Sequence, residues 1–114
     1  MSNFVTLLVE DDTFQREALA DVLKDEGFEV IEWTTGEAAE LIVASTGIEL
    51  QALVTDHNLP GAMSGTALAR YARSQCPHLN IVIMSGKTVD LMPVGTTFLQ
   101  KPFTRARLLE AVRA

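Results

Sequence analysis

The sequence predicts a doubly wound α/β fold, in which helices cover both faces of a five-stranded parallel sheet, in a single domain over residues 1–114. Two observations carry this prediction. Short runs that are apolar throughout alternate with segments of helical period, which is typical of strands buried on both sides. No repeat, low-complexity stretch or linker divides the 114 residues, and this length suits one domain.

The first half of the chain contains two strand and helix units. Val5–Val9 is a buried type of run, and apolar residues at helical spacing continue from Phe14 to a stop at Gly27. Phe28–Glu32 predicts the second strand. Thr34 and Glu37 then have the spacing of a capping box, which opens a helix that ends at Gly47.

The second half continues the alternation. Gln51–Thr55, Asn80–Met84 and Thr97–Gln100 predict the third, fourth and fifth strands. Between the third and fourth strands, Ser64 can cap a helix that Pro77 closes.

The remaining helices are unequal in length. A last helix is expected from about Thr104 to Val112. Between the fourth and fifth strands, Pro93 and Gly95 leave room for little more than one helical turn. The sequence therefore predicts that the fourth helix is short or irregular.

Composition narrows the classes of function. Nine Lys and Arg against 15 Asp and Glu give a net charge of −6, which disfavours binding to nucleic acid. The apolar runs are far shorter than the ~18 residues that suggest a membrane span. The lone Cys76 cannot form an internal disulfide, which favours a reducing, cytoplasmic setting.

Charged and polar residues follow the strands. Glu10 and Asp11 come after the first strand, Asp56 after the third, Ser85 after the fourth and Lys101 after the fifth. Right-handed crossovers bring the carboxyl ends of parallel strands to one edge, so we expect these side chains to meet there. Clustered carboxylates favour a cation, and Mg²⁺ prefers such oxygen ligands together with phosphate oxygens. Lys101 suits a phosphoryl oxygen, or Asp56 when no phosphoryl group is present, and the Ser85 hydroxyl can donate to the same oxygen.

Each of these residues also has an ordinary structural interpretation. Acids at strand ends often cap the next helix, as Asp12 or Thr13 is expected to do here. His57 follows Asp56 in an extended segment and should point to the opposite side, toward the surface. The joint placement of charged and polar residues at four strand ends is what favours a site.

Four segments carry a resemblance to a known family: Leu7–Asp12, Val54–Pro60, Ile83–Gly86 and Phe98–Phe103. Together they resemble the receiver domain of two-component response regulators, of the chemotaxis-protein type, over essentially the whole chain. This resemblance implies the flavodoxin-like (βα)5 fold with strand order 2-1-3-4-5.

The resemblance also implies the roles of the acidic residues. Asp56 would be the phosphoacceptor. Asp11 and Asp56 would bind Mg²⁺ directly, whereas Glu10 would act through water. Asn58 would offer its backbone carbonyl to the same ion.

Three further roles follow from the resemblance. Lys101 and Ser85 would contact the phosphoryl group, and Ser85 would also act as the switch hydroxyl. Phe98 would be the aromatic side chain that turns on phosphorylation. The bond between Lys101 and Pro102 would be the family's cis peptide.

The implied activity is that of a signalling receiver, which catalyses only its own phosphorylation and slow dephosphorylation. The expected partners are a sensor histidine kinase or histidine phosphotransfer protein and an unidentified downstream target protein, and a homodimer is open. Direct nucleic-acid binding and membrane binding are not expected.

Three alternatives are open. The domain could be a pseudo-receiver that serves only as an interaction module, or the receiver portion of a hybrid kinase or longer response regulator. A phosphatase that uses an aspartyl nucleophile on free substrates is disfavoured, because the haloacid-dehalogenase type needs a second Asp where Asn58 stands.

Two spacings depart from the family's usual pattern. Gly65 lies nine residues after Asp56, one position later than usual. From Ser85 to Lys101 is 16 positions, which is shorter than usual, and the missing residues fall where the fourth helix should be.

Overall fold

The computed structural model describes residues 4–46 and 49–114, so the predicted helix end at Gly47 lies outside the described residues. Within these ranges five parallel strands form one sheet in the order β2-β1-β3-β4-β5. This confirms the predicted doubly wound sheet and its strand order. The strands are β1 (Val5–Val9), β2 (Glu29–Trp33), β3 (Ala52–Asp56), β4 (Asn80–Ser85) and β5 (Thr96–Gln100).

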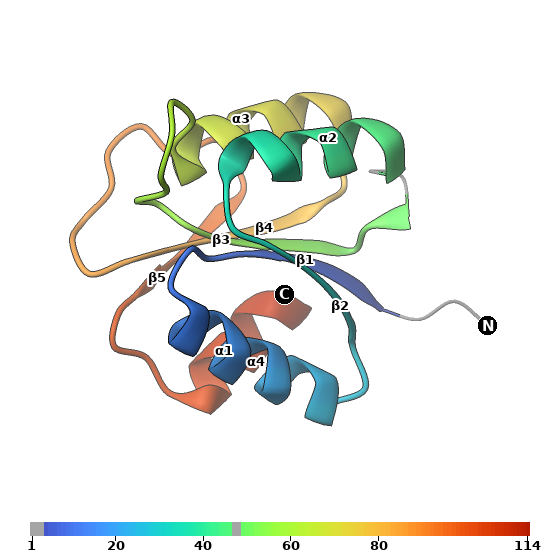
Figure 1. Ribbon diagram of the computed structural model, residues 1–114, viewed down its shortest axis with the longest axis vertical. Helices are drawn as coiled ribbons and strands as arrows, with labels where there is room; N and C mark the ends of the chain where they lie inside the picture. Colours follow the sequence, from blue (N-terminus) through green and yellow to red (C-terminus); the bar gives the residue numbers. More distant parts are fainter. Residues whose placement is uncertain (1–3, 47–48) are drawn as a thin grey trace.

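Helices cover both faces of the sheet, as Figure 1 shows. The two helices α2 and α3 lie side by side on one face, and α1 and α4 lie on the other. None of the helices in the described ranges is long and apolar enough to cross a membrane. The helices are α1 (Thr13–Asp25), α2 (Gly36–Thr46), α3 (Gly65–Gln75) and α4 (Arg105–Arg113).

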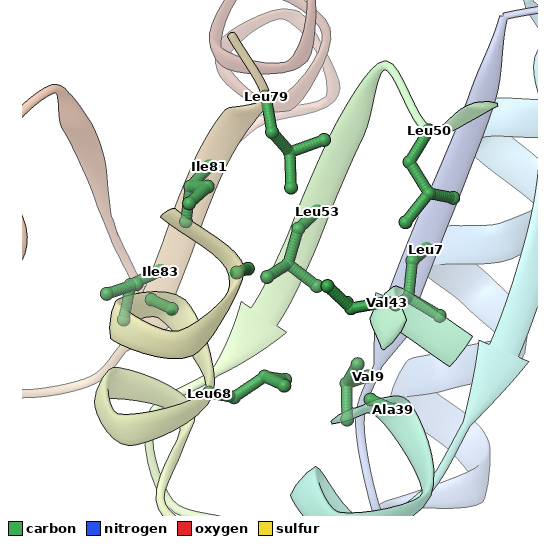
Figure 2. Packing of buried hydrophobic residues seen from close by; sticks show 12 residues of the cluster. Leu7, Val9, Ala39, Val43, Leu50, Leu53, Leu68, Leu79, Ile81 and Ile83 are labelled. Atoms are coloured by element: carbon green, nitrogen blue, oxygen red, sulfur yellow. The ribbon is translucent and has the colours of Figure 1, made fainter. Parts of the chain in front are cut away.

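Each face of the sheet has its own hydrophobic core. The core beneath α2 and α3 is seen at close range in Figure 2, where leucine, isoleucine and valine side chains from three strands meet those of the two helices. Burying one such side chain stabilises the fold by about 1.5–3 kcal/mol. The buried residues of this core are Leu7, Val9, Ala39, Val43, Leu50, Leu53, Leu68, Ala69, Ala72, Leu79, Ile81 and Ile83.

In helix α1 the spacing of apolar residues predicts the helix correctly but does not predict which of these residues are buried. Asp12 caps it, because the Asp12 carboxylate accepts a hydrogen bond of 2.9 Å from the backbone N–H of Gln15. Leu23 is fully buried, but Phe14, at the first turn, is 86% exposed. The apolar residue at the start of this helix therefore does not belong to the core.

Helix α2 begins one residue later than the capping-box prediction has it. The hydroxyl of Thr35, not of Thr34, accepts the backbone N–H of Ala38 at 3.1 Å. The Glu37 carboxylate instead accepts the backbone N–H of Ala62 at 2.9 Å, in the loop before α3. Glu37 thus ties the first turn of α2 to the loop before α3 rather than closing a capping box.

The segment between β4 and β5 (residues 86–95, called here the β4–β5 connection) contains no helical turn; all of its residues are described. The expected short or irregular helix is thus reduced to turns and bends, because ten residues that include Pro93 and Gly95 must also return to the start of β5. Val89 and Met92 are half-buried and pack against the core beneath α2 and α3. In Figure 1 this connection is the orange segment beside α3.

Candidate acidic and phosphoryl-binding site

Three carboxyl groups meet at the carboxyl edge of the sheet. Glu10 directly follows β1, Asp11 comes next, and Asp56 is the last residue of β3. Each offers an oxygen atom, and these atoms lie within 4.8 Å of one another. Glu10 is only 1% exposed and Asp56 9%, whereas Asp11 is open to solvent. The strand topology places these three acids together, as the sequence predicts.

Lys101 joins this cluster from the end of β5. Its Nζ lies 2.9 Å from Oε1 of Glu10 and 3.2 Å from Oδ1 of Asp56. A third acceptor, Oε1 of Gln15 in the first turn of α1, lies at 2.8 Å. An ammonium group has three N–H donors, so all three have an oxygen partner. The pairing of Lys101 with Asp56 is the one predicted for a site without a phosphoryl group.

Burial and charge act in opposite directions on this cluster. Burial raises the pKa of the Glu10 carboxyl, against the hydrogen bonds that it accepts from Lys101 and from the backbone N–H of Asp12. Burial alone would lower the pKa of Lys101, but its hydrogen bond to Glu10 and the charge of Asp56 outweigh this and raise it. Three clustered carboxyl groups with only one ammonium beside them leave an excess of negative charge, which is the environment that a hard divalent cation favours.

Of the other predicted site residues, Ser85 and Asn58 lie at the same edge, whereas Phe98 lies within β5. Ser85 ends β4, is 2% exposed, and its Oγ accepts the backbone N–H of Lys87 at 3.2 Å. Asn58 lies exposed in the turn two residues after Asp56. Phe98, in the middle of β5, pairs with Ile83 of β4 and therefore points to the face beneath α2 and α3, where it is half-buried.

The backbone around Lys101 also connects two of these strands. Its N–H donates to the carbonyl of Ser85 at 2.8 Å, which extends the pairing of β4 and β5 beyond the last strand residue. The peptide bond between Lys101 and Pro102 is cis, as the resemblance implies.

The loop after Asp56 is packed without spare room. A Cβ added to Gly65 would lie 1.9 Å from the carbonyl oxygen of Asp56, so only glycine fits at the start of α3. The Gly65 N–H also donates to the carbonyl of His57 at 2.8 Å. The loop is one residue longer than is usual in the family, but these two contacts of Gly65 show that it still closes against Asp56. The close approach explains why a glycine stands at this later position.

His57 does not have the surface role that the sequence predicts. Its ring is half-buried, and Nδ1 shares a hydrogen bond of 2.8 Å with the hydroxyl of Thr66, a 5% exposed residue in the first turn of α3. The alternation argument is sound for the strand, but β3 ends at Asp56 and the chain turns there.

Sequence reasoning missed two partners in this region, Gln15 and Thr66. Both are polar residues near the start of a helix, where a side chain at the surface is the ordinary expectation. Helix α1 begins directly after the Glu10 and Asp11 pair, which is the one feature that could have indicated Gln15.

Comparison with known proteins identifies the family. The sequence profile of the response regulator receiver domain matches residues 6–113. The chain is 33% identical over 113 residues to the transcriptional regulatory protein FixJ of Azorhizobium caulinodans, with 94% of this chain and 52% of FixJ covered. It is 37% identical over 112 residues to the response regulator protein FleR of Pseudomonas aeruginosa, with 93% of this chain and 23% of FleR covered.

A solved structure agrees with these relatives. The response regulator receiver protein of Sinorhizobium medicae superposes with a TM-score of 0.91 and 29% identity, over 97% of this chain and 92% of that protein. The chain thus has nearly the whole length of this solved receiver, whereas it spans about half of FixJ and about a quarter of FleR. The profile, the relatives and the fold agree that the chain belongs to the receiver domain family of two-component response regulators.

Proposed function

We propose that this receiver domain accepts a phosphoryl group on Asp56 from the phosphohistidine of a sensor histidine kinase or a histidine phosphotransfer protein. The observation that carries the proposal is the surroundings of Asp56. Its carboxylate lies at the sheet edge, within reach of solvent, and contacts Lys101 at 3.2 Å. Two more acids complete a cluster that a single ammonium does not neutralise.

The donor set fits Mg²⁺. Asp11 and Asp56 would bind the ion directly, Glu10 would act through water, and the backbone carbonyl of Asn58 would complete the protein's contribution. Hard oxygen donors with no nitrogen or sulfur among them are what this cation prefers. When bound, Mg²⁺ would offset the negative charge of the carboxylates and of the incoming phosphoryl oxygens.

The residues of the chain then supply a nucleophile and two donors. A carboxylate oxygen of Asp56 attacks phosphorus, an O–P bond forms, and the N–P bond of the phosphohistidine breaks, so its electron pair returns to the imidazole. The ammonium group of Lys101 then shifts its hydrogen bond from the Asp56 carboxylate to a phosphoryl oxygen, where the negative charge now lies. Ser85 donates its hydroxyl proton to another phosphoryl oxygen.

The phosphorylated product would act as a switch. It adds ~1.5–2 negative charges at the sheet edge, which draw the Ser85 hydroxyl toward them. Phe98, on the neighbouring strand, would turn inward as Ser85 moves, and this would change the surface offered to a downstream target protein. Slow attack of water on the phosphorylated Asp56 would reset the switch.

Mass spectrometry tests the proposal directly. The protein is incubated with acetyl phosphate and millimolar Mg²⁺, and a species heavier by about 80 Da, one phosphoryl group, is expected. Asp56→Asn is the matched control and should gain nothing. A folded wild-type protein that gains no mass, in the presence or absence of Mg²⁺, would favour a pseudo-receiver that serves only in protein interactions.

A further inference from the structure

Gln15 lies outside the acidic cluster but makes the shortest of the three contacts with Lys101. Its Oε1 is 2.8 Å from the Lys101 Nζ, against 2.9 Å for Glu10 and 3.2 Å for Asp56. The position of Gln15 is itself fixed, because its backbone N–H donates to the Asp12 carboxylate that caps α1. The amide oxygen therefore projects from a capped first turn and not from a loose loop.

The three acceptors around Lys101 differ in what else they would bind. Glu10 and Asp56 belong to the carboxyl group cluster that suits a divalent cation, so an ion there would compete with Lys101 for the same oxygens. The neutral amide of Gln15 is not a member of that cluster. A bound cation would thus weaken two of the three contacts of the ammonium and leave the third.

The Lys101 side chain has open space beside it, into which it can move if a cation displaces it from the carboxylates. Its stem lines a shallow hollow of about 450 Å³ between α1 and the segment after β5, together with Gln15, Ala18, Leu19, Pro102 and Phe103. A lysine side chain is flexible, and its ammonium group is repelled by a divalent cation. Without a neutral acceptor, Lys101 would move into this open hollow and away from Asp56.

We propose that Gln15 is a positioning residue, which holds Lys101 beside Asp56 while a cation occupies the carboxylates. The inference rests on the proposed function, because it assigns Gln15 a part in the same phosphoryl transfer. Gln15 acts through Lys101 and touches no reacting atom. Loss of the Gln15 amide should therefore lower the rate of phosphoryl transfer and leave the affinity for the cation unchanged.

The test uses Gln15→Met, which keeps the length and helical propensity of the side chain but removes the amide oxygen. Phosphorylation by acetyl phosphate is followed at saturating Mg²⁺, and Mg²⁺ affinity is measured by calorimetry. Gln15→Met should lower the maximal rate about 3- to 10-fold, the loss expected for one ordinary hydrogen bond at a solvent-exposed position. Its Mg²⁺ dissociation constant should change less than about twofold.

Two controls separate positioning from general damage. In a Lys101→Met background, Gln15→Met should have no further effect on the rate, because its partner is gone. An equal loss in both backgrounds, or a Gln15→Met variant as fast as wild type, would overturn the inference. A wild-type protein that is never phosphorylated would instead count against the proposed function.

A second readout needs no phosphorylation. NMR of the Lys101 ammonium protons in the presence of Mg²⁺ should show slow exchange with water in wild type and at least about tenfold faster exchange in Gln15→Met. Equal exchange rates in the two proteins would overturn the positioning role on its own.

Discussion

Two segments leave the carboxyl edge of the sheet toward the face beneath α2 and α3, and they are attached in different ways. The β3–α3 loop (residues 57–64) is closed by the main chain. The N–H of Gly65 donates to the carbonyl of His57 at 2.8 Å, and the α-carbon of Gly65 lies against the carbonyl of Asp56. The loop therefore follows the backbone of the proposed phosphoacceptor closely.

The β4–β5 connection is instead held by side chains from the neighbouring helix. Arg70 of α3 donates to the carbonyl of Leu91 at 3.2 Å, and Arg73 donates to the carbonyl of Gly95 at 3.4 Å. Its own apolar side chains reach the core at only two half-buried positions. Side-chain bonds of this kind can be lost one at a time.

This difference in attachment explains how the chain can lack a helix between β4 and β5 and still keep its acidic cluster at the end of β1 and β3. Contacts between backbone atoms leave no room for variation, so the loop that presents Asp56 has to close in one way. A connection held by two arginines can be short and irregular, because the sheet and α3 already exist without it. Stability should therefore be sensitive to small changes in the first segment and tolerant of them in the second.

The largest expected effect comes from Gly65→Ala. The new Cβ would lie 1.9 Å from the Asp56 carbonyl oxygen, so backbone atoms must move, and we expect a loss of about 3 kcal/mol or more in the free energy of unfolding. The matched change in the other segment is Gly86→Ala, where a Cβ meets nothing within 4 Å and the cost should stay below about 0.5 kcal/mol.

Urea denaturation of both variants measures this difference. Two variants of equal stability would show that the two segments do not differ as described. If Gly65→Ala yields too little folded protein for a titration while Gly86→Ala behaves as wild type, the contrast holds in its strongest form.

The next effect is expected from Arg73→Ala, which releases the β4–β5 connection. Besides the bond to Gly95, the guanidinium donates to the carbonyls of Pro77 and Leu79 at 3.0 and 2.7 Å. Losing these bonds should cost about 2 kcal/mol. Hydrogen exchange should increase over residues 86–95 and stay unchanged over residues 57–64.

Arg107→Ala is the matched control for this change. Arg107 is an exposed arginine of α4 whose guanidinium pairs with Glu110 on the same helix at 3.3 Å. Surface pairs of this kind contribute less than about 1 kcal/mol. Exchange that rises equally in both variants would mean that Arg73 does not hold the connection.

The sequence predicts β1, β3 and β4 well because each contains a short apolar run that ends at or just before a charged or polar residue. Placement of the acidic cluster then follows from topology, since parallel strands share a carboxyl edge. The sequence does not determine where α2 starts, because the hydroxyls of Thr34 and Thr35 can each cap a helix. Only the backbone geometry of the folded chain selects Thr35. Phe14 shows that periodicity does not set where a helix meets the core.

Contacts between a side chain and a distant backbone carbonyl leave no trace in the local sequence. Nothing near Arg73 indicates that its guanidinium reaches Gly95, 22 residues away. The partnership of Gln15 with Lys101 spans 86 residues and is equally invisible. Such contacts depend on the finished fold, whereas the cluster of Glu10, Asp11 and Asp56 depends only on strand order.

A smaller effect is expected from Thr66→Val, which removes the hydroxyl that bonds to the His57 ring but keeps the shape of the side chain. The loss should be about 1 kcal/mol, since the half-buried His57 ring is left without this hydrogen bond. Thr66→Ser, which keeps the hydroxyl and its hydrogen bond to the His57 ring, should lose less stability than Thr66→Val. If the valine variant is as stable as wild type, the hydrogen bond between Thr66 and His57 does not help to hold the β3–α3 loop.

The smallest effect has the opposite sign. Leu91, in the β4–β5 connection, has a φ of 58°, a left-handed conformation that is strained for leucine, and its side chain is 83% exposed. Leu91→Gly removes that strain without uncovering any core, and the Arg70 bond to its carbonyl needs no side chain. We expect a gain of about 0.5–1 kcal/mol in thermal or urea unfolding. A loss would mean that the Leu91 side chain contributes to the attachment of this connection.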